Sequence, residues 1–259
     1  MRWETLTSPE VDALDREVTI LVLPIGSVEQ HGNHMPVGTD TILAEAVSLA
    51  AAEQSDSVVL LPSPWYGFSA HHMRFPGSVS LRAETLMAIC EDIVGSVVAH
   101  GFRRVLIVNG HGGNGGIIDV LAATLGNRHY GRARIATLTY FTLAREAIAM
   151  LRRSPPGGMG HACEFETSMV QHIRPELVKL DRAVGTYPDP GSSYLTTDLI
   201  GSQAVRVYHD FGDLSPTGTL GDPSLASPEA GAAFFNACAQ ALADFISDFR
   251  SWRIPEPRA

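Results

Sequence analysis

Cysteine is scarce in this chain and shows no paired spacing. Only three of the 259 residues are cysteine, with no C-x-x-C motif: Cys90, Cys163 and Cys238. This odd and widely spaced set predicts buried, reduced thiols. A chain of this length buries roughly 70–75% of its unfolded surface, so it needs neither a disulfide nor a structural metal to hold a core.

Positive charge and long apolar runs are also in short supply. The 19 Lys and Arg residues are outnumbered by 28 Asp and Glu residues, for a formal net charge of −9. Without a basic block, the chain is not expected to bind nucleic acid or an anionic membrane. The first residues, MRWETLTSPEVDALD, lack the apolar core of a secretory signal, and runs such as residues 18–25 are far too short to span a bilayer. We expect a soluble, cytoplasmic protein.

Short apolar runs alternate along the chain with longer segments of helical pattern. Four runs are nearly continuously apolar, as strands covered on both faces are: residues 17–24, 57–62, 103–109 and 132–140. Ala, Leu, Ile and Val recur at helical spacing in residues 41–54, 83–100 and 116–125. This alternation predicts an α/β fold whose central sheet is mostly parallel.

The last helix has the clearest pattern. Ser227 is placed to cap it, Pro228 suits its first turn, and an apolar stripe runs from Phe234 to Phe249. The Gly/Pro-rich segments 155–160 and 187–193 are flanked by strongly patterned sequence, so we interpret them as loops. We therefore expect a single domain over residues 1–259.

Ligands of open α/β sheets bind at the carboxyl ends of the strands, which draws attention to the segment after the first strand. Glu29 and His31 are two residues apart, so an extended backbone would aim both to the same side. Asp40 follows nine residues after His31. Imidazole plus carboxylates is a ligand set for Zn²⁺, Mn²⁺ or Fe²⁺. The alternative for Asp40 is an N-cap of a helix that begins at Thr41.

The segment after the third strand is rich in glycine. It contains G-x-G-x-x-G at Gly110, Gly112 and Gly115, but no acidic residue follows at the end of the next strand, as a dinucleotide site requires. We favour another interpretation, in which the glycines let the backbone approach a site closely and His111 offers a ring nitrogen to that site. A non-catalytic nucleotide- or sugar-binding protein that uses the Gly110–Gly116 loop remains the alternative function.

Two further segments combine polar groups. Residues 70–78 contain His71 and His72, and residues 161–168 contain a histidine and two acids at the start of a helix. A structural role is the alternative for each histidine of the first segment, and macrodipole compensation is the alternative for the acids. Four other histidines have no such polar cluster beside them in sequence, and we interpret them as surface or packing residues: His100, His129, His172 and His209.

Together these segments resemble the creatininase family of metal-dependent amidohydrolases. The matching stretches are EQHGNHMPVGTD (29–40), FPGS (75–78), NGHGGN (109–114), HACEFETS (161–168) and TGTLGDP (217–223). The resemblance implies a three-layer α/β/α sandwich around a mostly parallel sheet. It also implies two divalent metal ions per chain (Zn, Mn or Fe) and a homohexamer.

The resemblance also assigns roles to residues. It implies that Glu29 and His31 are ligands of separate metals, that Asp40 bridges the two, and that His111 binds the same metal as Glu29. Three further residues are expected to contact the substrate: His72, Ser78 and Gly112.

One position departs from the family pattern. Creatininase has an acid two residues after the histidine of its NGH motif, and here that position is Gly113. Glu164 and Glu166 are the candidates to replace it. Residues two apart diverge by about 200° around a helix, so only one of them can point inward. The match to the E-T-S motif favours Glu166 as ligand or proton shuttle, and leaves Glu164 as a solvent-facing acid.

These residues predict a hydrolase of a carbon–nitrogen bond in an amide, cyclic amide or formamide. Divalent metals lower the pKa of bound water towards about 7, generating hydroxide, and polarise the carbonyl. His161 or Glu166 can then move a proton to the departing nitrogen. Creatininase places tryptophans over its substrate before the matching histidine, whereas this chain has tryptophan only at Trp3, Trp65 and Trp252. The expected substrate is therefore another small molecule or a short peptide amide, as in pyrimidine deformylation or mycofactocin maturation.

Overall fold

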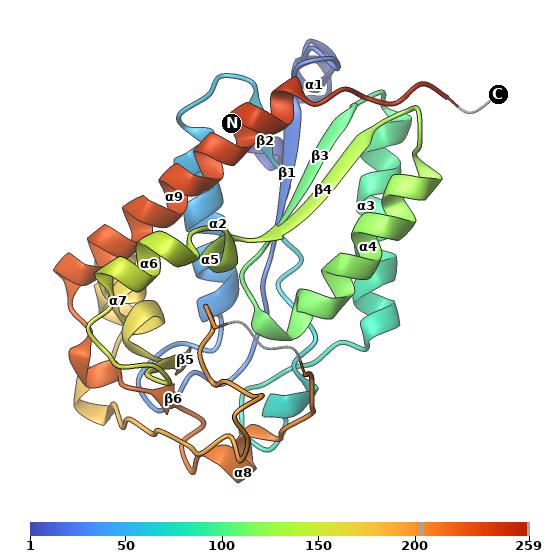
Figure 1. The fold of residues 1–259 in the computed structure, drawn as a ribbon. Helices are drawn as coiled ribbons and strands as arrows, with labels where there is room; N and C mark the ends of the chain where they lie inside the picture. The colour runs from blue at the N-terminus through green and yellow to red at the C-terminus, as the bar shows by residue number, and fades with distance from the viewer. Residues whose placement is uncertain (202–204, 258–259) are drawn as a thin grey trace.

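A four-stranded parallel sheet forms the centre of the protein in the computed structural model, which describes residues 1–201 and 205–257. Its strands, in the order β2-β1-β3-β4, are β1 (Ile20–Ile25), β2 (Val58–Leu60), β3 (Arg104–Asn109) and β4 (Arg134–Thr139) (Figure 1). β1 pairs with β3 along its whole length, from Ile20 opposite Arg104 to Ile25 opposite Asn109. All four predicted strands are confirmed, each slightly shorter than its apolar run.

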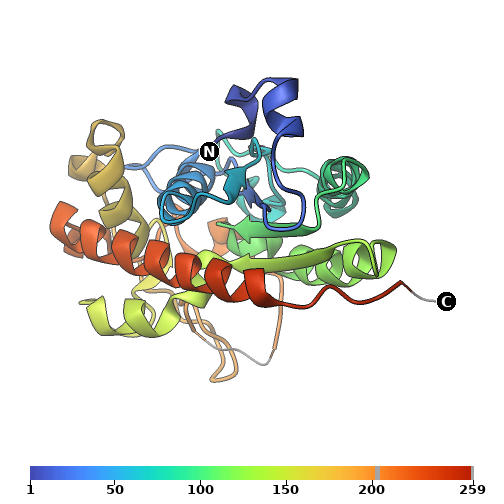
Figure 2. The same ribbon diagram turned by 90° about the horizontal axis from the view of Figure 1, so that it is seen from above.

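Helices cover both faces of this sheet (Figure 2). Alternate residues of β1 divide between two cores, as side chains on a strand must. Ile20 and Val22 pack in one core with α2 (Thr39–Ala52), α7 (Glu164–Ile173) and α9 (Pro228–Ser251). Leu21 and Leu23 pack in the other core with α3 (Ala83–Ala99) and α4 (Gly115–Arg128). The predicted three-layer α/β/α sandwich is confirmed.

β4 differs from the expectation of a strand buried on both faces. All six of its residues are only half-buried. β4 is an edge strand that pairs with β3 alone. The other edge strand, β2, is buried, and there the first residues of the chain cover the outer side by pairing with Leu60. An apolar run in sequence does not distinguish an edge strand from a central one.

The last helix behaves as its sequence predicts. Ser227 Oγ accepts a hydrogen bond from the backbone N–H of Ala230 at 3.1 Å, and Pro228 occupies the first turn of α9. The side chains at the centre of the stripe are buried against α7 and α2: Phe234, Cys238, Leu242, Ile246 and Phe249. Removing an aliphatic or aromatic side chain of this kind from water contributes about 1.5–3 kcal/mol. All three cysteines are free and buried, as predicted.

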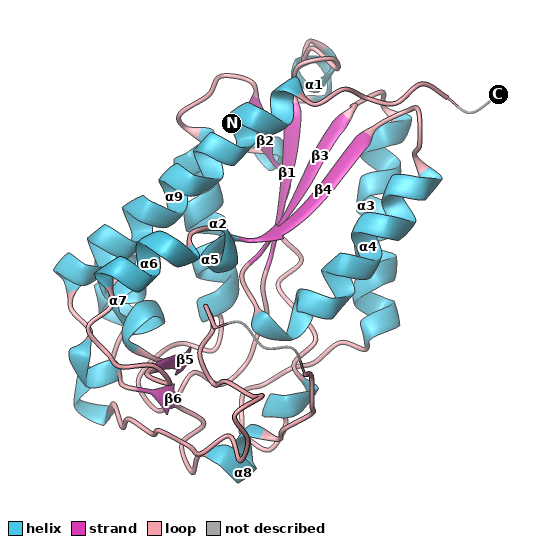
Figure 3. Cartoon of the chain, viewed as in Figure 1, coloured by secondary structure: helices cyan, strands magenta, loops and turns pink. Residues whose placement is uncertain are grey.

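The shorter elements and most loops gather at the carboxyl ends of the strands (Figure 3). They include α5 (Tyr140–Leu143), α6 (Arg145–Leu151), α8 (Phe211–Leu214) and an antiparallel pair, β5 (Met159–His161) and β6 (Leu220–Gly221). α1 (Ser8–Asp12) lies near the other end of the sheet (Figure 1). None of the helices in the described part of the chain combines the length and hydropathy needed to cross a bilayer.

The strand order places a switch point between β1 and β3. From β1 the chain continues to β2 on one side, and from β3 it continues to β4 on the other. The connections therefore leave these two strands in opposite directions, and a crevice opens at their carboxyl ends. The segments that follow β1 and β3, residues 29–40 and 109–114, meet there.

Candidate metal centre

The loop after β1 brings two carboxylates and an imidazole together. It folds back on itself, with the backbone N–H of Glu29 donating to the carbonyl of Val37 at 2.8 Å. Glu29, His31 and Asp40 are all buried, and His31 Nε2 lies 3.1 Å from Asp40 Oδ1. The N-cap of α2 is Gly38, so Asp40 stands inside the first turn. The alternative interpretation of Asp40 as the helix cap is therefore wrong.

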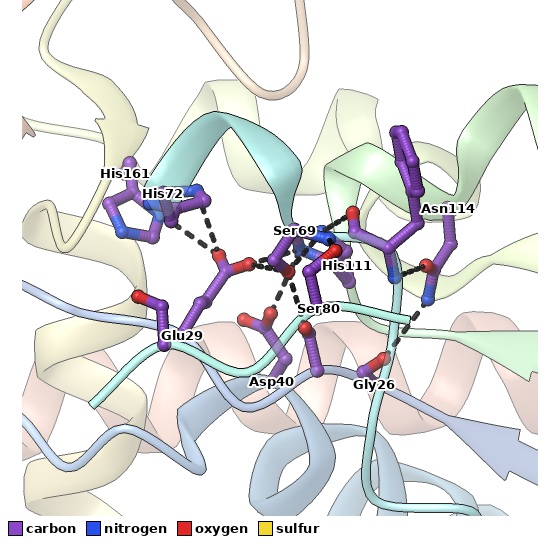
Figure 4. Close-up of polar contacts among 12 residues, drawn as sticks. Gly26, Glu29, Asp40, Ser69, His72, Ser80, His111, Asn114 and His161 are labelled. Atoms are coloured by element: carbon purple, nitrogen blue, oxygen red, sulfur yellow. Dashed lines mark hydrogen bonds and ion pairs between the residues drawn. The ribbon is translucent and has the colours of Figure 1, made fainter. Parts of the chain in front are cut away.

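The glycine-rich loop after β3 adds His111. The Asn109 side chain fixes this loop, since its amide nitrogen donates to the His111 carbonyl at 2.7 Å and its oxygen accepts from the His111 N–H at 3.0 Å. His111 Nε2 donates to the Phe68 carbonyl at 3.0 Å. Its Nδ1 therefore faces the carboxylates, 3.2 Å from Glu29 Oε2 and 2.9 Å from Asp40 Oδ2 (Figure 4).

Two more histidines contact the other oxygen of Glu29 (Figure 4). His161, at the end of β5, donates from Nε2 to the Gln30 carbonyl at 2.7 Å and places Nδ1 3.7 Å from Glu29 Oε1. His72 accepts at Nδ1 from the Gln30 side-chain amide at 2.9 Å, so its Nε2 carries the proton and lies 3.2 Å from Glu29 Oε1. Gln30 thus orients both rings.

Glu164 and Glu166 point in different directions from the start of α7. Glu166 Oε1 lies 3.8 Å from His31 Nε2, and Oε2 accepts from the Ala162 N–H at 2.6 Å. Glu164 turns away, accepting the backbone N–H groups of Arg153 at 2.9 Å and Ser154 at 2.8 Å. Glu164 is fully buried, so the prediction that it faces solvent is wrong. Two backbone donors satisfy its carboxylate in the interior.

Gly113, which stands where creatininase has an acid, is closed to any side chain. A Cβ there would lie 2.4 Å from His111 Nε2 and 2.5 Å from the Phe68 carbonyl oxygen. The hydrogen bond that orients His111 therefore occupies the space that an acid would need. A further carboxylate for the cluster has to come from elsewhere, and Glu166 is the one placed beside His31.

Burial and mutual charge shift the pKa values of the cluster strongly. Burial, reinforced by the nearby Asp40 charge, raises the pKa of Glu29 despite the opposing effect of His111. Burial would lower the pKa of His31 and His111, but the adjoining carboxylates outweigh it and raise both well above 6.5. For Asp40 the two histidines outweigh burial and lower the pKa. The pKa of His161 lies well below 6.5, mainly because of burial.

These donors fit a divalent cation. Within the described residues, His31 Nε2 and Asp40 Oδ2 are buried and form no regular hydrogen bond; their polar neighbours are Asp40 Oδ1 at 3.1 Å and His111 Nδ1 at 2.9 Å, respectively. His31 donates from Nδ1 to the Glu29 carbonyl at 3.2 Å, which directs its other ring nitrogen at the carboxylates. A metal-ligating histidine usually donates a hydrogen bond from its other ring nitrogen in this way. Ligand atoms of Glu29, His31 and Asp40 lie within 4.8 Å of one another, and so do those of His31, His161 and Glu166.

Ser69 contacts this cluster from a position that carries no site motif. Ser69 Oγ lies 2.5 Å from Glu29 Oε2 and 3.2 Å from His111 Nε2, and is buried. Ser69 lies 40 residues from Glu29 and 42 from His111 in sequence, and a single serine forms no recognisable motif. The only available signal was its position directly before the segment 70–78.

A cavity of about 1020 Å³ opens beside the cluster. Its lining includes His72 and Gly112, two of the three residues expected to contact substrate. Ser78, the third, does not line it, because its Oγ accepts the Gln30 N–H at 3.0 Å. His209 lines the cavity, contrary to its interpretation as a surface or packing residue. So does His71, whose pKa burial lowers to about 4.

Comparison with known proteins gives consistent matches. Residues 4–246 match the family Creatininase, described as creatinine amidohydrolase. The creatinine amidohydrolase of Pseudomonas putida is 30% identical over 242 residues, covering 88% of this chain and 89% of that protein. The mycofactocin precursor peptide peptidase of Mycolicibacterium smegmatis is 32% identical over 247 residues, covering 93% and 89%. A crystal structure of creatininase superposes with a TM-score of 0.80 at 29% identity, covering 97% of this chain and 98% of that one.

The fold and the site together define a metal-dependent amidohydrolase, a hydrolase that acts on carbon–nitrogen bonds. The chain belongs to the creatininase family. The alternative of a nucleotide- or sugar-binding protein is not supported. The Gly110–Gly116 loop is held against α2, where a Cβ at Gly110 would lie 2.7 Å from the Asp40 carbonyl oxygen, and it presents His111 to the carboxylates.

Proposed function

We propose that this chain binds two divalent ions (Zn, Mn or Fe) and uses them to hydrolyse an amide, a cyclic amide or a formamide. Glu29 and His111 would hold one ion, His31 and Glu166 the other, with Asp40 between them. The observation that supports this proposal is the convergence of buried imidazole nitrogens and carboxylate oxygens within 4.8 Å of one another, among which His31 Nε2 and Asp40 Oδ2 form ion-pair contacts but no regular hydrogen bond. Solved creatininases include manganese and zinc forms.

Divalent ions in such a site lower the pKa of water and polarise the carbonyl of the substrate. The residues around them supply orientation and proton transfer. His161 is neutral at pH 7, because burial lowers its pKa, and its Nδ1 faces the cluster and can accept a proton. The proton taken from water would then pass to the leaving nitrogen, from His161 directly or through the carboxylate of Glu166, whose ligand atom lies within 4.8 Å of that of His161. His72 donates to Glu29 and lines the cavity, where it can hold the substrate.

The cavity favours a substrate larger than creatinine. Its volume of about 1020 Å³ lies at the upper end of the range for drug-sized ligands. Neither Trp3, Trp65 nor Trp252 lines the described cavity, so an aromatic cover made of tryptophan is absent there. A small molecule with an extended substituent, or a short peptide amide, fits this space. A homohexamer and a cytoplasmic location remain predictions from the resemblance and the composition.

Metal analysis and an activity panel test the proposal. Protein purified without chelator should contain close to two Zn, Mn or Fe ions per chain, and the metal-loaded protein should hydrolyse at least one of a cyclic urea, a formamide and a short peptide. Asp40→Asn serves as the matched variant that should lose both properties. Less than about 0.3 metal per chain, with no activity after adding Mn²⁺, Zn²⁺ or Fe²⁺, would contradict the proposal.

A further inference from the structure

One part of the cavity lining is apolar and comes from a single stretch of chain. Among the described residues from 195 to 214, the aliphatic and phenylalanine side chains that line the cavity form what we call the apolar wall: Leu195, Leu199, Ile200, Val207, Phe211 and Leu214. The metal-ligand cluster, by contrast, is made of charged and polar groups. A substrate in this cavity therefore meets polar groups at its reacting bond, and beyond it a lining in which apolar side chains alternate with polar ones such as Arg206 and His209.

Phe211 is the member of the apolar wall that reaches the histidines. Its ring centroid lies 4.2 Å from that of His72, 5.1 Å from that of His71 and 5.3 Å from that of His161. The side chain is only half-buried, so part of the ring remains open to the cavity. An aromatic ring held beside the catalytic imidazoles can pack against the group next to the scissile bond.

An ionic clamp holds Phe211 in this place. Arg74 forms an ion pair with Asp213 on α8 and lies 3.6 Å, Nη1 to Oδ1, from Asp210. Asp210 also caps α8, accepting the N–H of Gly212 at 2.8 Å. Arg74 stands two residues after His72, so the segment that supplies this histidine also fixes the helix that carries Phe211.

We propose that Phe211 recognises an apolar, aromatic-sized group adjoining the scissile amide, and that Arg74 is the positioning residue that keeps it there. This inference rests on the proposed function, because it assigns the substrate class of the same site. Aromatic pairs gain energy beyond the area they bury. The Phe211 ring itself offers a charged substituent no ion-pair partner, although Arg145 and Arg206 line the same cavity.

Two hydroxamates test the recognition without requiring a known substrate. Acetohydroxamic and benzohydroxamic acid share a metal-chelating head and differ only in a methyl or a phenyl group. Calorimetric titration of the Mn²⁺-loaded protein should show benzohydroxamic acid binding about tenfold more tightly. Phe211→Ala should abolish this preference and Phe211→Leu should reduce it, both with unchanged metal content. Tyr194→Ala, an exposed aromatic on the same stretch and outside the lining, should keep it in full.

The outcomes separate this inference from the proposed function. If both hydroxamates bind the wild-type protein equally, or if Phe211→Ala keeps the preference, Phe211 does not recognise the substituent while the metal site stands. If neither hydroxamate binds and no metal is retained, the proposed function itself fails.

The positioning role of Arg74 is tested separately, by hydroxamate preference and by hydrogen exchange. Arg74→Gln should lower the hydroxamate preference and increase amide hydrogen exchange in residues 210–214, and Arg74→Lys should restore both towards wild type. A merely structural surface charge would leave the preference unchanged in Arg74→Gln. That result would overturn the clamp while leaving Phe211 in its role.

Discussion

The metal-ligand cluster and the apolar wall are built in opposite ways. Glu29, His31, Asp40 and His111 are buried, and they follow β1 and β3 directly or stand in the first turn of α2. The imidazole rings of His31 and His111 are fixed by hydrogen bonds to backbone carbonyls. The apolar wall comes from a long stretch whose described residues form one α-helix, α8, which has four residues and is held by ion pairs at the surface.

This difference indicates that the segments directly after the sheet strands carry the catalytic groups, and that the stretch of the apolar wall determines which substrate is preferred. Reacting groups require positions held within about half an ångström, which rigid elements provide best. A loop at the surface tolerates sequence change, because few buried contacts depend on it. Substitutions in the cluster should therefore remove metal and every activity together, and substitutions in the wall should change only which substrate is preferred.

The largest effect is expected for Asp40→Asn. The amide keeps the size of the side chain but removes the charge that faces both His31 and His111. We expect activity to fall by about 10³-fold or more, as loss of several kcal/mol of charge stabilisation implies, together with loss of metal. Metal analysis and turnover check this, with Glu45→Gln on the same helix as a control that retains both. Full activity in Asp40→Asn would exclude a bridging role.

Glu166→Gln and Glu164→Gln test which acid belongs to the cluster. Glu166→Gln should lose about one of the two metals per chain and most of the turnover. Glu164→Gln should keep its metal but unfold more easily, by about 1–3 kcal/mol, because a carboxylate that accepts two buried N–H groups is replaced by an amide with one oxygen. Metal content and denaturant unfolding distinguish the two. The assignment is reversed if Glu164→Gln loses metal while Glu166→Gln keeps metal and turnover.

Ser69→Ala should produce a smaller effect on the same cluster. Its hydroxyl orients Glu29 and contacts His111, and removal of an outer partner of metal ligands typically weakens affinity by about 10–100-fold. Competition with a fluorescent chelator measures this change. Ser96→Ala, on an exposed position of α3, is the control and should bind metal as wild type does. An unchanged affinity in Ser69→Ala would place Ser69 outside the metal site.

A change of pH, rather than of sequence, should also alter the affinity of the cluster for metal. The carboxylates raise the pKa of His31 and His111 well above 6.5, so the metal-free protein holds protons on these rings at neutral pH. Metal binding must release those protons, and affinity should therefore fall as the pH drops from 8 towards 6, by about tenfold per pH unit for each proton released. Titrations in buffers of different ionisation enthalpy count the protons. A metal occupancy that stays flat from pH 8 to 5 would contradict the assignment of these ligands.

Several features could be read from the sequence because they depend on local pattern. The four strands, the helices between them and the capped helix α9 follow from apolar periodicity and from residues such as Ser227. The residues after β1 and β3 were found because parallel strands end at the same edge of a sheet. Family motifs then added Glu166, whose distance from His31 no pattern of spacing gives.

Only the tertiary structure decided the rest. The partial exposure of β4 depends on which segments cover its open side in the sheet, and the burial of Glu164 depends on two N–H groups ten and eleven residues away in the chain. Ser69 and Phe211 reach the site from segments that carry no motif. Phe211 contacts His72 more than a hundred positions away, and Ser69 contacts Glu29 and His111 from 40 and 42 positions away. Local pattern determines which segments become strands and helices, whereas packing determines which side chains meet, because those contacts arise only once the layers have assembled.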